Sequence, residues 1–168
     1  MNNIYLTGFM GAGKSAAGRE LAKLLGFAFY ETDLETVKLI GTCIADFMRR
    51  NGAQAFREKE SEALTKLSRG TRTVISCGGG TLLPRENVII ARNSGKVIHI
   101  NTPFYECFKR IHGDPNRPLA AGKSRKELEE LYIKRLNYYT SSANFAVPGI
   151  GSPKDTAAKI AAWLAQPK

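Results

Sequence analysis

The stretch that decides the fold class is "GFMGAGKSAAGRELAKLLG", residues Gly8–Gly26. Its first eight residues fit the spacing G-x-x-x-x-G-K-[ST]. Glycines allow the backbone to fold into a tight loop whose N–H groups converge on phosphate oxygens. A strand predicted at 3–7 precedes the loop, and a helix predicted at 14–25 follows it. The start of that helix adds the positive end of its dipole, so the stretch predicts a nucleoside triphosphate site.

The residues of this loop have separate expected roles. Lys14 is predicted to reach the β- and γ-phosphates, and the Ser15 hydroxyl is predicted to ligate Mg²⁺. The phosphates are expected to be cradled by the backbone of Gly11, Ala12, Gly13 and Ala16. The loop alone does not distinguish ATP from GTP. The sequence lacks a guanine-reading N-K-x-D motif, and 168 residues leave little room beyond a nucleotide core, which favours a small-molecule or nucleotide kinase that uses ATP.

Length and composition indicate one folded domain over residues 1–168, since 43% of the residues are hydrophobic. No apolar run approaches the roughly 18 residues of a membrane span, and the first residues do not resemble a secretory signal. The three cysteines, Cys43, Cys77 and Cys107, fit no zinc spacing. We therefore expect buried free thiols in a protein of the reducing cytoplasm.

The net charge of +10 predicts an anionic partner, such as a nucleic acid, an acidic membrane or a phosphorylated small molecule. A nucleic-acid surface typically interleaves stripes of Lys and Arg with aromatic residues. Here the basic residues stand among acidic ones, as in "FREKESEALTK" (56–66) and "SRKELEELYIKR" (124–135). We therefore expect a small-molecule substrate, no nucleic-acid or membrane partner, and a monomer.

Apolar runs and helical periodicity alternate along the chain. Strands are predicted at 3–7, 28–30, 72–77, 96–100 and 145–147. Helices are predicted at 14–25, in three pieces over 32–69 broken near Gly41 and Gly52, from 103, at 124–141 and from 153. This order predicts an α/β fold with three α/β/α layers, in which ligands bind at the carboxyl ends of a five-stranded parallel sheet.

Local signals predict how individual helices pack and begin. Leu21, Leu24 and Leu25 are expected to share one face of the first helix. Helix starts are predicted from capping patterns at Thr32 with Glu35, Thr102 with Pro103, Ser124 with Glu127, and Ser152 with Pro153.

Residues that follow the other predicted strands indicate the site of the phosphoryl acceptor. Asp33 follows the second strand and can accept a hydrogen bond from a substrate hydroxyl, orient it or deprotonate it. The alternative is an acidic residue that stabilises the first turn of a helix. Gly78–Gly80 follow the strand at 72–77 and would let a ligand approach backbone N–H groups closely. The alternative is a loose connection.

Three arginines are candidates for anion binding, because a guanidinium forms paired hydrogen bonds with a carboxylate or a phosphate. Arg57, Arg117 and Arg135 lie in segments that can face the carboxyl edge of the sheet, and the alternative for each is a solvated helix face. Arg117 belongs to "HGDPNRPLAAGK" (112–123), whose composition is typical of a mobile loop. Beside a phosphate site, such a loop is expected to close as a lid and bring Arg117 onto the transferred group.

Several motifs taken together resemble the shikimate kinase family. They are the loop at 8–15, "FYETD" (29–33), "IADFMRRNGAQAFREKESEAL" (44–64), "ISCGGGTLL" (75–83), "NRPLA" (116–120) and "YIKRLNYY" (132–139). The resemblance extends over residues 3–163 and implies a P-loop fold like that of nucleoside monophosphate kinases. It also implies phosphorylation of the 3-hydroxyl of shikimate by ATP with Mg²⁺. A gluconate kinase, a nucleoside monophosphate kinase and a nucleic-acid-binding P-loop module are the alternatives.

The resemblance implies roles for residues that match the family's motifs. Asp33 matches the residue that binds the substrate hydroxyls and acts as a base, and Arg57 and Arg135 match the pair that clamps the carboxylate. The remaining matches are Gly79, between Gly78 and Gly80, for a backbone contact to the substrate, Arg117 for the ATP phosphates and Arg110 for the adenine.

The chain departs from the family pattern in two places. The family commonly has an Asp-x-Asp pair, whereas this chain has Glu31-Thr32-Asp33, so Glu31 would reach the metal only through a water molecule. The segment "PGIGSPKD" (148–155) lacks an arginine just before Pro153, so adenine contacts there are expected from backbone and apolar groups.

Overall fold

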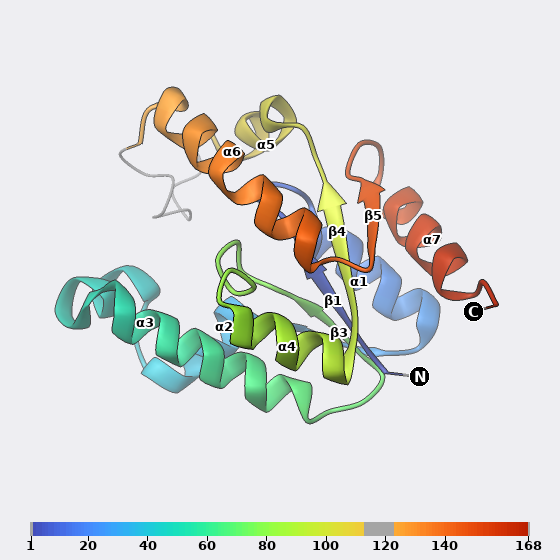
Figure 1. Ribbon diagram of the computed structural model, residues 1–168, viewed down its shortest axis with the longest axis horizontal. Coiled ribbons are helices and arrows are strands. Elements are labelled where there is room, and N and C mark those ends of the chain that lie inside the picture. The colour runs from blue at the N-terminus through green and yellow to red at the C-terminus, as the bar shows by residue number, and fades with distance from the viewer. Residues whose placement is uncertain (1, 113–122, 168) are drawn as a thin grey trace.

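The computed structural model describes residues 2–112 and 123–167 (Figure 1). The predicted lid, including Arg117, falls almost entirely within 113–122 and therefore lies outside the described residues.

A five-stranded parallel sheet forms the centre of the molecule and confirms the predicted fold class (Figure 1). The strand order is β2-β3-β1-β4-β5, and every neighbouring pair is parallel. β1 is buried along its whole length because strands lie on both sides of it and helices cover both faces. The strands are β1 (Asn3–Thr7), β2 (Ala28–Glu31), β3 (Thr73–Ser76), β4 (Gly95–Asn101) and β5 (Phe145–Pro148).

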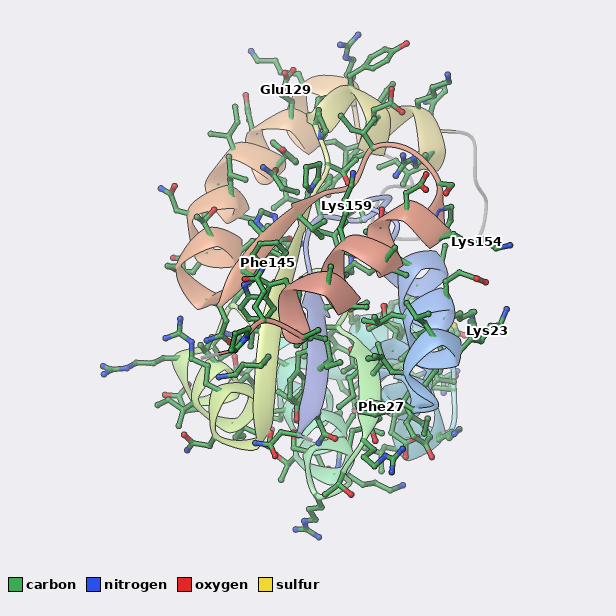
Figure 2. All side chains as sticks on the ribbon, turned by 90° about the vertical axis from the view of Figure 1, so that its right-hand side faces the viewer. Lys23, Phe27, Glu129, Phe145, Lys154 and Lys159 are labelled. Atoms are coloured by element: carbon green, nitrogen blue, oxygen red, sulfur yellow. The ribbon has the colours of Figure 1, made fainter. Side chains whose placement is uncertain are left out.

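Helices cover both faces of the sheet, and each face has its own apolar cluster. On one face α1 (Lys14–Leu25) packs against α7 (Pro153–Leu164). Figure 2 views this side and shows α7 beside α1, with Lys23 near the end of α1 and Lys154 near the start of α7. On the other face, α3 (Ile44–Ser68) and α4 (Arg85–Ser94) cover the cluster around Tyr5. The remaining helices are α2 (Thr32–Ile40), α5 (Phe104–Ile111) and α6 (Arg125–Ser142).

Two predicted helix caps are wrong, because their hydroxyls bond to distant parts of the chain instead. α2 begins at Thr32 itself, and Thr32 Oγ1 accepts the N–H of Gly78 at 2.8 Å. Thr102 Oγ1 donates to the carbonyl oxygen of Ala12 at 2.9 Å, and α5 begins at Phe104.

Other local predictions have mixed outcomes. The capping box at Ser124 is confirmed, the helix predicted from Ser152-Pro153 begins there, and the chain breaks between helices at Gly41 and kinks at Gly52. Helix α4 was not among the predicted helices, because it is short and buries only two of its ten residues, Asn87 and Ala91.

Two further predictions are wrong: that Leu24 shares the face of Leu21, and that Cys43 is buried. Leu24 is 60% exposed, because it lies off the inward face of α1 that buries Leu21. Cys43 is exposed at the N-cap of α3, whereas Cys77 and Cys107 are buried as expected. Among the described residues, no helix has the length and apolar character needed to cross a membrane.

The two leucines of α1 allow a paired test of this core. Leu21→Ala is expected to lower the free energy of unfolding by about 2–5 kcal/mol, because a fully buried side chain leaves a cavity. Leu24→Ala is expected to change it by less than about 0.5 kcal/mol, because the side chain is mostly in water. Urea denaturation of both variants measures the difference, and equal losses would contradict the packing of α1.

Candidate active site

The phosphate-binding loop between β1 and α1 has the backbone that its glycines predict. Gly8, Gly11 and Gly13 have φ angles of 146°, 77° and 94°, which side chains other than glycine rarely allow. Gly13 is the N-cap of α1, so the positive end of that helix faces the loop. Lys14 Nζ donates to the carbonyl oxygens of Gly8 and Phe9 at 2.8 and 2.9 Å, which holds the ammonium over the loop.

A pair of hydroxyls lies next to the start of α1. Ser15 Oγ is 3.3 Å from Ser76 Oγ at the end of β3. Ser76 pairs in register with Glu31 of β2, whose carboxylate forms an ion pair with Arg19 at 3.1 Å. No group of three or more His, Cys, Asp or Glu side chains in residues 2–112 and 123–167 could hold a metal ion. The hydroxyls of Ser15 and Ser76 are oxygen donors, and Mg²⁺ takes few such protein ligands and keeps waters and phosphate oxygens.

Helix α5 and the loops that carry Thr102 and Gly149 contact the phosphate-binding loop. Arg110 of α5 donates to the carbonyl oxygens of Gly11 and Gly149, both at 3.2 Å. Thr102 bonds to Ala12 and to Gly149, which lies four residues before Pro153. Arg110 therefore lies beside the phosphate-binding loop, and its contact with the adenine stays a prediction. Pro153 is exposed at the start of α7.

The predicted acceptor residues come together around Gly78–Gly80, the loop after β3. Asp33 is so close to Gly78 that a side chain at this glycine would collide with its carboxylate. In the same way, a side chain at Gly80 would collide with the Arg57 guanidinium. Arg135 of α6 donates to the carbonyl oxygen of Gly79 at 3.4 Å. Residues from three helices therefore converge on one loop, next to the phosphate-binding loop.

Glu60 also belongs to this cluster and was not predicted. Its side chain is only 2% exposed, forms an ion pair with Arg57 and accepts the Thr81 hydroxyl at 2.6 Å. A buried carboxylate needs such partners, because an unpaired charge is costly to remove from water. The signal in the sequence was the spacing of Arg57 and Glu60, three residues apart on one helix.

The environment of Asp33 changes its proton affinity. The residue lies at an exposed position, yet protein atoms surround its carboxylate and remove much of its hydration. This desolvation raises the pKa of Asp33, and the Glu60 carboxylate raises it further, against the opposing effects of Lys14 and Arg57. A raised pKa makes Asp33 a stronger proton acceptor than an ordinary aspartate.

His99 lies in β4 beside these groups and was also not predicted. It is 3% exposed, pairs in register with Thr7 of β1, and its ring lies 5.6 Å from the ring of Tyr139. Burial lowers the pKa of His99 to about 4, and the Lys14 ammonium contributes to this shift. The imidazole is therefore neutral at pH 7, close to the Lys14 ammonium.

The parallel sheet, the phosphate-binding loop and the adjoining cluster of arginines define a P-loop kinase with the nucleoside monophosphate kinase-like fold. A family model described as shikimate kinase matches residues 10–165. A shikimate kinase from Persephonella marina is 41% identical over 142 residues, which are 84% of this chain and 86% of that protein. The chain belongs to the shikimate kinase family.

Solved structures agree with this assignment. A shikimate kinase from Acinetobacter baumannii in complex with shikimate superimposes with a TM-score of 0.93 at 32% identity, covering 98% of this chain and 93% of that one. A gluconokinase from Sinorhizobium meliloti reaches a TM-score of 0.67 at 16% identity, covering 98% and 91%, and this likeness shows the fold alone. The enzyme is therefore a kinase that uses ATP and acts on a small molecule.

The buried neutral His99 is expected to destabilise the fold in mild acid. Its folded pKa of about 4 lies below the unfolded value of 6.5, so the unfolded chain binds the proton first as the pH falls. The stabilisation is complete above about pH 6.5 and is lost progressively towards pH 4. Wild type should lose about 2–3 kcal/mol more than His99→Gln between pH 7 and pH 4, in urea titrations at each pH. Parallel stability curves would contradict this burial of His99.

Proposed function

We propose that the enzyme transfers the γ-phosphoryl group of ATP to the 3-hydroxyl of shikimate. The observation that carries the proposal is the convergence of two arginines and one aspartate on the Gly78–Gly80 loop, adjacent to the phosphate-binding loop. A cyclic hydroxy acid needs both features, because its carboxylate must be anchored and its hydroxyl must face the phosphate. A nucleotide acceptor would not require two arginines for one carboxylate.

In this proposal the guanidinium groups of Arg57 and Arg135 bind the carboxylate of shikimate, each as a fork of two N–H donors. Asp33 accepts the hydrogen bond of the 3-hydroxyl and orients its oxygen. The backbone N–H of Gly79 contacts the substrate, and the small residues Gly78 and Gly80 let it approach the loop.

On the donor side, Lys14 binds the β- and γ-phosphates, and the backbone from Gly11 to Ala16 cradles them. Ser15 would hold Mg²⁺, which neutralises charge on the phosphates when bound. Glu31 could contact a metal-bound water only in competition with its ion pair to Arg19. Arg110 and Pro153 border the adenine, and Arg117 is proposed to close onto the phosphates from the lid at 112–123.

The chemical step follows from these positions. The 3-hydroxyl oxygen attacks the γ-phosphorus in line with the bond to the β-phosphate oxygen, which breaks to release ADP. Asp33 accepts the hydroxyl proton as the new bond forms, which its raised pKa favours. Lys14 stabilises the negative charge on the transferred group.

A single domain, a monomeric state, a cytoplasmic location and the lack of nucleic-acid or membrane partners stay predictions.

A coupled assay of ADP formation tests the proposed function. Wild type should phosphorylate shikimate and should show no comparable turnover with gluconate. Lys14→Ala should lower kcat by at least about 10³-fold, because it removes the cation at the transferred group. Turnover of gluconate without turnover of shikimate would overturn the proposal, and salt-sensitive DNA binding without kinase activity would favour the nucleic-acid alternative.

The arginine clamp makes a second prediction. Arg57→Lys and Arg135→Lys should each raise KM for shikimate by about 10- to 100-fold, because lysine keeps the charge but loses the fork. KM for ATP should change by less than about three-fold. Arg50→Lys, at an exposed position of the same helix as Arg57, is the matched control and should leave both constants unchanged. Unchanged shikimate KM in both clamp variants would show that the carboxylate binds elsewhere.

A further inference from the structure

We propose that Tyr139 is a positioning residue for the phosphoryl acceptor, because its hydroxyl fixes the orientation of the Gly79–Gly80 peptide on which the acceptor rests. The inference rests on the proposed function, since it assigns a role within the same acceptor site.

Tyr139 is held firmly in the interior. Its side chain comes from α6, is 2% exposed and stacks at a tilt against His99 of β4, with 5.6 Å between the ring centroids. Its hydroxyl donates to the carbonyl oxygen of Gly79 at 2.8 Å. Burial raises the pKa of Tyr139 to about 12, so the phenol keeps its proton and stays a donor over any ordinary assay pH.

The loop is anchored from two opposite sides. Thr32 of α2 accepts the N–H of Gly78 at 2.8 Å, whereas Tyr139 of α6 binds the carbonyl of Gly79. A trans peptide is planar, so a carbonyl directed at α6 forces the N–H of Gly80 to point away from α6. Within the described part of the chain, the N–H groups of Gly79 and Gly80 donate to no other protein group, whereas that of Thr81 bonds to Gly78. The bond from Tyr139 therefore fixes the direction of the Gly80 N–H, a donor that has no protein partner among the described residues and can serve the acceptor.

Tyr139 also affects Arg135, one turn earlier on the same helix. Arg135 contacts the same carbonyl oxygen at 3.4 Å, a longer distance than the 2.8 Å of Tyr139. A carbonyl oxygen has two lone pairs, and the phenol occupies one of them with good geometry. Without the phenol, the guanidinium would be the remaining donor to this carbonyl and would be drawn away from the acceptor's carboxylate.

The test is Tyr139→Phe, which removes one oxygen and keeps the packing against His99. KM for shikimate should rise by about 3- to 10-fold, the equivalent of one net hydrogen bond, whereas kcat and KM for ATP should stay within about two-fold of wild type. The matched control is Tyr132→Phe. Tyr132 also lies on α6 and donates to a backbone carbonyl, that of Thr102 at 3.1 Å, on the nucleotide side. It should leave KM for shikimate unchanged.

Several outcomes would overturn the inference. They are an unchanged shikimate KM in Tyr139→Phe, an equal rise in both Michaelis constants, or the same shikimate effect in Tyr132→Phe. Tyr139→Phe combined with Arg135→Lys gives an independent measure, because two residues that act through one carbonyl should cost less together than the product of their separate effects. If Tyr139→Phe did not fold, the shikimate KM of Tyr139→His, whose ring is too short to bring an N–H to the Gly79 carbonyl oxygen, would have to show the same selective rise. Lack of shikimate turnover in wild type would instead refute the proposed function itself.

Discussion

The parallel pairing of β1 with β3 is the constraint on which the active site depends. The N–H of Cys77 donates to the carbonyl oxygen of Leu6 at 3.0 Å, so the chain after β3 leaves the sheet beside the chain after β1. This places the Gly78–Gly80 loop next to the phosphate-binding loop. The same register brings Ser76 to Ser15. Because side chains alternate between the two faces of a strand, a slip of one residue would turn Ser76 to the opposite face.

Electrostatic interactions couple the residues proposed to bind the substrates with Asp33, the proposed base. Glu60 compensates the Arg57 cation and, from the same place, raises the pKa of Asp33. Lys14 and Arg57 act in the opposite direction, and Lys14 also helps to keep His99 neutral. The proton affinity of the proposed base is therefore raised by burial and by Glu60 and lowered by Lys14 and Arg57, the residues proposed to bind the two substrates. Charges interact strongly when protein replaces water around them.

α6 connects the two halves of the site. Tyr132 reaches the carbonyl of Thr102, whose hydroxyl bonds to the phosphate-binding loop, and Tyr139 reaches the carbonyl of Gly79 on the acceptor side. Arg135 lies between these tyrosines in the sequence. One rigid helix therefore carries contacts to the nucleotide side, to the acceptor loop and to the proposed carboxylate site, so its placement determines the geometry of all three.

The sequence by itself determined the order of the five strands, all helices but α4, and the phosphate-binding loop, because glycine backbone freedom and apolar periodicity act over a few residues. The resemblance of its motifs to the shikimate kinase family gave Asp33, Arg57 and Arg135 their expected roles, which stay predictions. Only the tertiary structure decided which groups the hydroxyls of Thr32, Thr102 and Tyr139 bind. Their partners lie 46, 90 and 60 residues away, so local patterns that predict helix caps could not reveal them. A hydroxyl bonds to the best-placed group in the folded chain, and only the folded chain brings that group near.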